Sequence, residues 1–224
     1  MVQPEDLRGT YSRISRWAEK NFKGILWTVA AVLLMGAVIA VFGIRENRQN
    51  DQASALEAEA NRRYSAVGSA PGILEGLEYG KALALYREIA EKYSGTRSAP
   101  IAEFYMGNAY RHLRQWDKAV ESYETFIRNH SGHPLLPFVQ LSLGYTHLEK
   151  GDFQKAVAAF QSAAELKSSS VAAQAIFEIG RSYEFSNNPS AAREKYEALR
   201  KSHPTSPWAQ EAAVRINQFQ KEGG

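Results

Sequence analysis

Side chains that could bind a metal or transfer a proton are few in this sequence and lie far apart. There is no cysteine among the 224 residues, which excludes disulfides, thiolate nucleophiles and cysteine-bound metals. His130 and His133 have a spacing that could bind a metal, but no acidic residue stands near them in the sequence. We interpret this histidine pair as part of a loop between two structural units.

Two glutamate pairs are the other candidates for chemistry. Glu121 with Glu124, and Glu194 with Glu197, could share a proton as the carboxylates of acid–base catalysts do. A spacing of three places each pair on one helix face, where solvated carboxylates are the simpler interpretation. Glycine-rich phosphate loops and the motifs of zinc proteases and serine hydrolases are absent. The sequence therefore predicts a protein that is not an enzyme and has no cofactor or metal.

The net charge of +3 lies entirely at one end of the chain. Residues 1–48 carry seven Lys or Arg and four Asp or Glu, whereas residues 49–224 carry 20 of each. Because the longer C-terminal part is neutral, we expect no nucleic acid as a partner. The change in composition indicates a boundary near residue 48.

The sequence predicts an apolar helix near the N-terminus of the chain. Residues 24–44 read GILWTVAAVLLMGAVIAVFGI, without a charge. A helix of that length spans about 30 Å, the thickness of a bilayer core. A cleavable signal peptide and a buried helix of a soluble protein are the alternatives. The length of the stretch and the residues 1–23 before it favour an uncleaved transmembrane helix.

The flanks of this span predict its orientation. Four basic residues precede it, namely Arg13, Arg16, Lys20 and Lys23. Only Arg45 and Arg48 follow closely, together with Glu46 and Asp51. The positive-inside rule therefore predicts a cytoplasmic tail over residues 1–23. Within this tail, apolar residues at helical spacing predict an amphipathic helix on the inner leaflet, the alternative being a solvated lead-in.

The C-terminal part contains internal repeats. Four segments share an alanine followed four residues later by an aromatic residue, and the aromatic residues are 37, 37 and 36 positions apart. The pairs are Ala82 and Tyr86, Ala119 and Tyr123, Ala156 and Phe160, and Ala192 and Tyr196. Upstream of the last three pairs stand Gly107, Gly144 and Gly180, at spacings of 37 and 36. Two patterns with one register indicate a repeated structural unit.

We interpret each unit as two antiparallel helices, because short turns at 114–115, 150–152 and 186–188 separate them. Glycine in mid-helix costs about 1 kcal/mol relative to alanine, so its recurrence indicates that the second helix crosses closely there. We expect the alanines to be the small partners at these crossings and the aromatic rings to fill the gaps between hairpins. Asp117 and Asp152 are expected to cap second helices.

These residues resemble the tetratricopeptide repeat family, whose hairpins carry apolar-Gly-x-x-Tyr on the first helix and Ala-x-x-x-aromatic on the second. The resemblance covers residues 79–219 well and 50–78 loosely. It implies an all-α chain, in which the transmembrane helix is followed by an α-solenoid over residues 45–221 with a C-terminal capping helix. Complete repeats begin near Ile101, Phe138 and Gln174. An incomplete first hairpin is formed by 51–66 and 79–93, with a loop at 68–76, and His147 replaces the family's tyrosine.

Two further resemblances concern location. The junctions at 93–100, 130–137 and 203–207 look like those of periplasmic members of the family: the Tol-Pal-associated cell-division coordinator and the repeat lipoprotein of outer-membrane assembly. The tail residues 16–23, one span and a following helix are similar in arrangement to the ancillary subunit of the bacterial Sec translocon. These resemblances imply a bacterial inner-membrane protein whose repeats lie in the periplasm.

The family resemblance also implies a binding site, because first helices line the concave face of such solenoids. The positions that carry over are Ile101, Phe104, Asn108, Arg111, His112, Phe138, Leu141, Tyr145, Leu148, Glu149, Phe177, Arg181, Glu184 and Phe185. This mixture of apolar, aromatic and charged residues suits a peptide segment of a partner protein. The alternative for Ile101, Phe138, Leu141 and Phe177 is a place in the core between repeats.

Two functions remain open at this point. One is a scaffold that binds envelope or secreted client proteins near the secretion or envelope-assembly machinery. The other is a structural protein that forms homo-oligomers, or coordinates division or the outer membrane, without binding clients.

Overall fold

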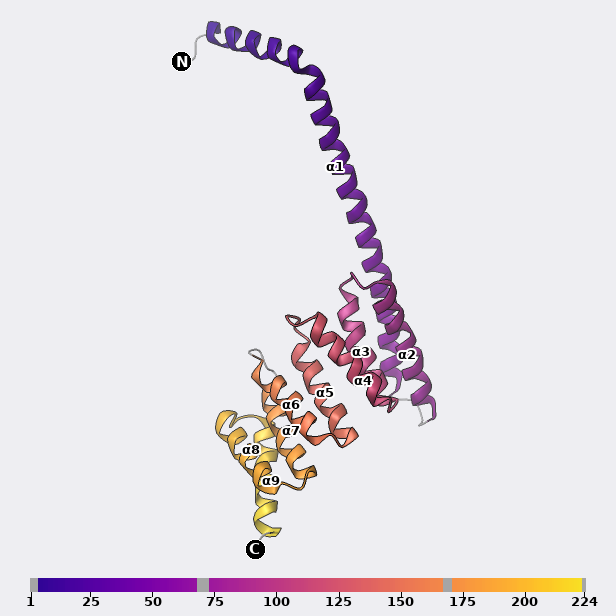
Figure 1. Cartoon of the computed structure of the whole chain (residues 1–224), viewed down its shortest axis with the longest axis vertical. Helices are drawn as coiled ribbons and strands as arrows, with labels where there is room; N and C mark the ends of the chain where they lie inside the picture. Colours follow the sequence, from indigo (N-terminus) through magenta and orange to yellow (C-terminus); the bar gives the residue numbers. More distant parts are fainter. Residues whose placement is uncertain (1–3, 68–72, 167–170, 223–224) are drawn as a thin grey trace. The chain divides into compact units, whose positions relative to one another are not determined.

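The computed structural model describes residues 4–67, 73–166 and 171–222, and in these ranges its regular secondary structure is helical (Figure 1). The chain divides into two compact units, Met1–Gln49 and Asn50–Gly224. Helix α1, Pro4–Ala66, begins in the first unit and ends in the second. The amphipathic helix that we expected in the tail is thus part of one longer helix.

The first unit contains the apolar residues 24–44. Within the part of the chain that the structure describes, α1 is the helix that is long and apolar enough to cross a membrane. None of its most apolar segment is buried inside the protein, and Leu34, for example, is 69% exposed. An apolar helix without protein around it gains most by burial in lipid. The helix is therefore consistent with a single membrane span.

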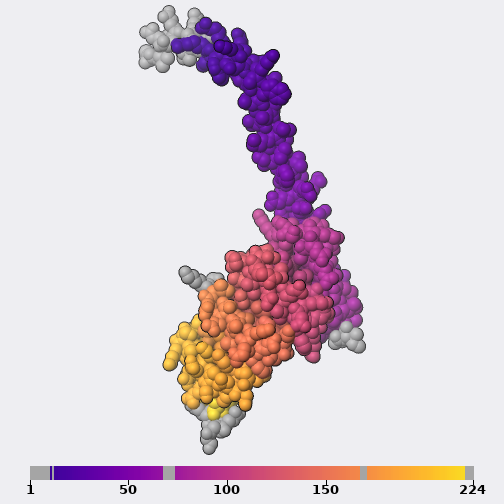
Figure 2. Space-filling view, viewed as in Figure 1, coloured from indigo at the N-terminus to yellow at the C-terminus, as the bar shows by residue number. Residues whose placement is uncertain are grey.

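The second unit is a stack of helical hairpins that follow one another in sequence order (Figures 1 and 2). After the end of α1 come α2 (Ile73–Lys92), α3 (Ser98–His112), α4 (Trp116–Asn129), α5 (Leu136–Lys150), α6 (Phe153–Glu165), α7 (Ala172–Phe185), α8 (Pro189–Ser202) and α9 (Pro207–Glu222). Each helix from α2 to α9 packs against the next. This arrangement confirms the expected α-solenoid with a terminal helix.

The first hairpin differs from expectation in its loop. Helix α2 begins at Ile73, six residues before the expected start at Tyr79. Of the loop expected at 68–76, residues 68–72 lie outside the described ranges, and residues 73–76 are helical. Gly76, which ends the expected loop, is therefore inside α2. No heavy atom lies within 4 Å of the position that a Cβ atom on Gly76 would occupy, so no close contact requires glycine there.

The recurrence of the mid-helix glycines has a different cause from the one predicted. A Cβ atom on Gly107 would lie 2.5 Å from a ring carbon of Tyr123, and one on Gly144 would lie 2.5 Å from Phe160. Gly180 meets Tyr196 in the same way. The close neighbour is thus the aromatic ring of the same hairpin, not the alanine. All three rings are fully buried, so each fills the inside of its hairpin.

The prediction that Asp117 and Asp152 cap second helices is wrong. Asp117 does not cap α4, since it lies beyond the cap residue Gln115 and pairs with Lys150 of α5. Asp152 is the cap residue of α6, but its side chain accepts no capping hydrogen bond. By contrast, Asn188 caps α8 by accepting a hydrogen bond from the backbone N–H of Ala191 at 3.2 Å.

Candidate protein-binding surface

Polar side chains connect the first helices of consecutive hairpins. The connections run from α3 to α5, from α5 to α7 and from α7 to α9. They are Arg111 Nη1 to Glu149 Oε1 at 2.6 Å, Tyr145 Oη to Glu178 Oε1 at 3.0 Å, and Arg215 Nη1 to Glu184 Oε2 at 3.6 Å. Because these pairs join helices of different repeats, they hold neighbouring first helices in register along this side of the solenoid.

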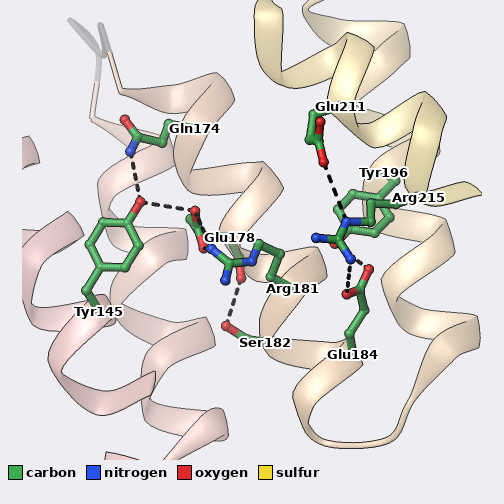
Figure 3. A network of polar contacts seen from close by, with 9 residues as sticks. All are labelled: Tyr145, Gln174, Glu178, Arg181, Ser182, Glu184, Tyr196, Glu211 and Arg215. Carbon is green, nitrogen blue, oxygen red and sulfur yellow. Dashed lines mark hydrogen bonds and ion pairs between the residues drawn. The ribbon is translucent and has the colours of Figure 1, made fainter. Parts of the chain in front are cut away.

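The middle connection is centred on a buried carboxylate (Figure 3). Glu178 is 2% exposed and accepts hydrogen bonds from Tyr145 and from Arg181, whose Nη1 lies 3.0 Å from Oε2. Gln174 donates to Tyr145 Oη at 2.8 Å. Burial raises the pKa of the Glu178 carboxyl, against the opposing effects of Arg181 and Tyr145. Burial of the Tyr145 hydroxyl, together with the nearby Glu178 carboxylate, raises the pKa of Tyr145 to about 12.

The connection between α7 and α9 includes a residue of the second helix. Tyr196 Oη donates to Glu184 Oε1 at 2.8 Å, and Arg215 lies between Glu184 and Glu211 (Figure 3). The prediction included Glu184 but missed Arg215 and Glu211, because it treated α9 only as a cap. The signal that could have found them is the position of α9, which follows α8 as a first helix would.

Two of the predicted binding residues lie in the protein core. Asn108 is 8% exposed, and its Oδ1 accepts a hydrogen bond from Tyr123 Oη at 2.6 Å. Phe177 is 3% exposed and packs against Tyr196 and Trp208 with ring centroids 5.3 Å apart in each pair. Both side chains are occupied by internal contacts, so we do not include them in the surface proposed below.

The other apolar positions divide between core and surface. Leu141 is buried, and Phe104, Leu148 and Ile101 are half-buried, with Phe104 and Leu148 packed against the core. Phe138 is 39% exposed. The core alternative is therefore the better description of Leu141 and Phe177.

Phe185 is the most exposed of the predicted aromatic residues, at 54%. Its ring is stacked on Phe153 of α6, with centroids 6.3 Å apart, and the Arg181 guanidinium lies 5.6 Å from its centroid. Exposed aromatic and arginine side chains are the types that contribute most to protein interfaces. Arg181 also lines a hollow of about 340 Å³ between α7 and α9, with Phe177 and Trp208 among its other lining residues.

Three predicted residues meet at a second hollow, of about 490 Å³, near the turn between α3 and α4. They are Arg111, His112 and Glu149, and the other lining residues, Arg114 and Trp116, were not predicted. The His112 ring is stacked on Tyr79 of α2 with centroids 4.5 Å apart and planes 6° apart. Burial, and secondarily Arg111, lowers the pKa of His112, so the ring is neutral at pH 7.

The histidine pair considered for metal binding has an acidic neighbour that the sequence did not indicate. Glu103 of α3 lies 3.1 Å from His130 Nε2. The rings of His130 and His133 are also close to Phe126. Within the described ranges there is nevertheless no group of three potential ligands that could hold a metal ion.

Comparison with known proteins supports the repeat assignment. The family model described as tetratricopeptide repeat matches residues 74–134, 104–171 and 141–207. No curated protein matches the chain.

Several solved structures share the fold at low sequence identity. Kinesin light chain repeats from Podospora anserina align with 16% identity over 80% of this chain and 87% of theirs, with a TM-score of 0.54. BtubC from P. vanneervenii aligns with 18% identity over 80% of this chain and 84% of its own, with a TM-score of 0.54. The MamA protein gives 16% identity, 78% and 88% coverage, and a TM-score of 0.54. At such identities the likeness concerns the fold alone, whereas the family model matches more than half of the sequence. The chain belongs to the tetratricopeptide repeat family.

Proposed function

We propose that this protein is a membrane-anchored scaffold that binds segments of partner proteins through its first helices. The proposed binding surface consists of Arg111, His112, Tyr145, Leu148, Glu149, Arg181, Glu184 and Phe185. The observation that carries the proposal is the exposed Phe185 ring, flanked by Arg181, which also lines the hollow between α7 and α9. An aromatic ring that is more than half exposed costs free energy in water and gains it in an interface.

We further propose that α1 anchors the protein in a bacterial inner membrane, with the tail in the cytoplasm and the repeats in the periplasm. The basic residues before the span support this orientation. The resemblance to translocon-associated and envelope repeat proteins supports a role near the secretion or envelope-assembly machinery. Fusing a periplasmic and a cytoplasmic reporter after Gly224 tests the orientation. An active cytoplasmic fusion with an inactive periplasmic one would reverse it.

Site-specific crosslinking tests partner binding in the intact membrane. A photoreactive residue is placed at Phe185 or at Tyr145 of the full-length protein, and at Lys155 as a control. Lys155 is exposed on the second helix α6 and is not one of the residues of the proposed surface. We expect adducts with other proteins from Phe185 and Tyr145 and none from Lys155. Adducts that contain only this chain would instead support the structural, self-assembling function.

A further inference from the structure

The turn between α3 and α4, beside the hollow of about 490 Å³, differs from the equivalent turns of the other hairpins. Among the hairpin turns that the structure describes in full, α3–α4, α5–α6 and α7–α8, each has one residue at positive φ: Arg114 at 58°, Gly151 at 83° and Asn187 at 58°. These residues are 37 and 36 positions apart and are therefore equivalent. Glycine and asparagine adopt this conformation readily, whereas for arginine it costs free energy. The unfavourable residue at this one turn suggests that its side chain has a use.

Among the residues that the structure describes, the Arg114 guanidinium has no acidic partner. It is exposed and lines the hollow, and none of the ion pairs among the described residues includes it. The only carboxylate in the lining, Glu149, is already bound by Arg111. The lining therefore carries one positive charge in excess, since His112 is neutral at pH 7. A negatively charged group would complement it.

The same hollow interrupts a regular series of ring contacts between repeats. Three equivalent positions, 37 residues apart, lie in the first part of successive second helices. They are Tyr79 of α2, Trp116 of α4 and Phe153 of α6. Tyr79 stacks on His112 and Phe153 stacks on Phe185, each a residue at the end of the next first helix. At the middle position that residue is Glu149, a carboxylate instead of a ring. The space that a ring fills at the other two junctions is thus open at this one.

Two residues that line this opening, Arg111 and Trp116, each carry a buried donor. Nε of Arg111 and Nε1 of Trp116 have no hydrogen-bond partner within the described parts of the chain. A buried N–H without an acceptor is unfavourable, so an acceptor brought to it is favoured. Both atoms are buried, and the residues that carry them, Arg111 and Trp116, line the hollow.

We propose that this hollow is the subsite that binds an acidic side chain, Asp or Glu, of a partner protein, with Arg114 as the residue that pairs with the carboxylate. The carboxylate accepts hydrogen bonds from Arg114, and the Trp116 indole in the same lining reports its arrival. This inference rests on the proposed function, because it specifies the chemistry of the partner segment at one end of the binding surface.

The experiment uses the full-length, isotope-labelled protein in detergent micelles and two short probes, Ac-Ala-Glu-Ala-NH₂ and Ac-Ala-Gln-Ala-NH₂. The indole N–H signal of Trp116 is identified by its loss in Trp116→Phe and followed by NMR. We expect the glutamate peptide to shift this signal in a saturable way, with affinity about tenfold higher than that of the glutamine peptide. Equal shifts by both peptides, or no shift with either, would overturn the proposal.

Variants at Arg114 test the proposal without disturbing the turn. Arg114→Gly and Arg114→Asn install the residues of the two equivalent turns, so the melting temperature is expected to stay unchanged or rise by up to about 3 °C. Both variants should nevertheless lose the preference for the glutamate peptide, and Arg114→Lys should retain part of it. Lys155→Gln, which removes one positive charge elsewhere, should behave like the wild type. A glutamate preference that survives in Arg114→Gly would refute the assignment.

The peptide experiment and the crosslinking experiment can fail independently of each other. Partner adducts from Phe185 without a glutamate preference at Trp116 would overturn this inference and leave the scaffold proposal standing. A glutamate preference without any partner adducts would overturn the scaffold proposal and leave the acidic subsite standing.

Discussion

Substituting Gly144 in the middle of α5 by alanine tests the packing inside a hairpin. The new Cβ would lie 2.5 Å from two ring carbons of Phe160, whereas carbons in contact are about 3.5–4.0 Å apart, so the ring must retreat by about 1 Å. Phe160 is fully buried, and Tyr145 stands edge-on to it with centroids 5.3 Å apart. The ring therefore has no open space to enter.

The expected magnitude follows from two opposing effects. Overpacking costs about 1–3 kcal/mol, and the upper value applies because the obstructing group is a rigid ring in the core. Alanine regains about 1 kcal/mol over glycine in a helix. Gly144→Ala should thus lose about 2 kcal/mol of unfolding free energy. Gly80→Ala is the matched control, because Gly80 is helical and has nothing within 4 Å of its Cβ position. It should gain about 1 kcal/mol.

Circular dichroism during thermal unfolding of the full-length variants shows whether each substitution lowers or raises the stability. For a chain of this size about 1 kcal/mol corresponds to 2–4 °C, so Gly144→Ala should melt about 4–8 °C lower and Gly80→Ala about 2–4 °C higher. Adding Phe160→Leu to Gly144→Ala should relieve the clash, with a coupling free energy of about 1 kcal/mol or more. A Gly144→Ala variant that melts at or above the wild-type temperature, or losses that simply add in the double variant, would refute the packing argument.

Further predictions concern polar side chains that make contacts within the protein. Tyr123→Phe removes the donor to Asn108 and should cost about 1–2 kcal/mol in chemical denaturation, whereas Tyr123→Ala should cost about 3–5 kcal/mol by opening a cavity. Because burial raises the pKa of Glu178, the folded chain holds that proton more tightly than the unfolded chain. The melting temperature of the wild type relative to Glu178→Gln should therefore fall as the pH rises above the ordinary carboxyl range, and a pH-independent difference would contradict this. The pKa of His112 is lowered instead, so its contribution is present above the ordinary histidine pKa and is lost as the pH falls below it. A pH titration of melting temperature against His112→Asn, which removes the titrating ring, measures this loss.

Repeat register and hairpin topology could be predicted because they depend on periodicity alone. Two patterns at spacings of 37 and 36 identify equivalent residues without any knowledge of how helices cross. The partner of each glycine could not be derived in this way. Gly144 is sixteen residues from Phe160 and twelve from Ala156, and both lie on the same second helix. Only the crossing geometry determines that the ring, rather than the methyl group, occupies the space.

The polar contacts between repeats were less predictable for a related reason. Arg111 and Glu149 were both predicted to line the binding face, but nothing in their types indicated that they pair with each other. Asp117 was expected to cap α4, but α4 begins at Trp116 with Gln115 as the cap residue, so Asp117 lies in the first turn, where it pairs with Lys150 of α5. The sequence places a helix start only to within a residue or two, which decides whether a side chain can cap.

These internal pairs determine how the neutral repeat unit can recognise a partner. Residues 49–224 have no net charge, and most charges on the first helices are already engaged, as between Arg181 and Glu178 or Arg215 and Glu184. Steering of a partner by a long-range field is therefore weak in this unit. Under the proposed function, recognition would depend on short-range features that these ion pairs leave available. Phe185, as an exposed ring, and Arg114, as a cation without an acid in the described parts of the chain, are two such features at different repeats. A partner segment that carries an apolar residue and an acidic residue, separated by the distance between these repeats, would satisfy both at once.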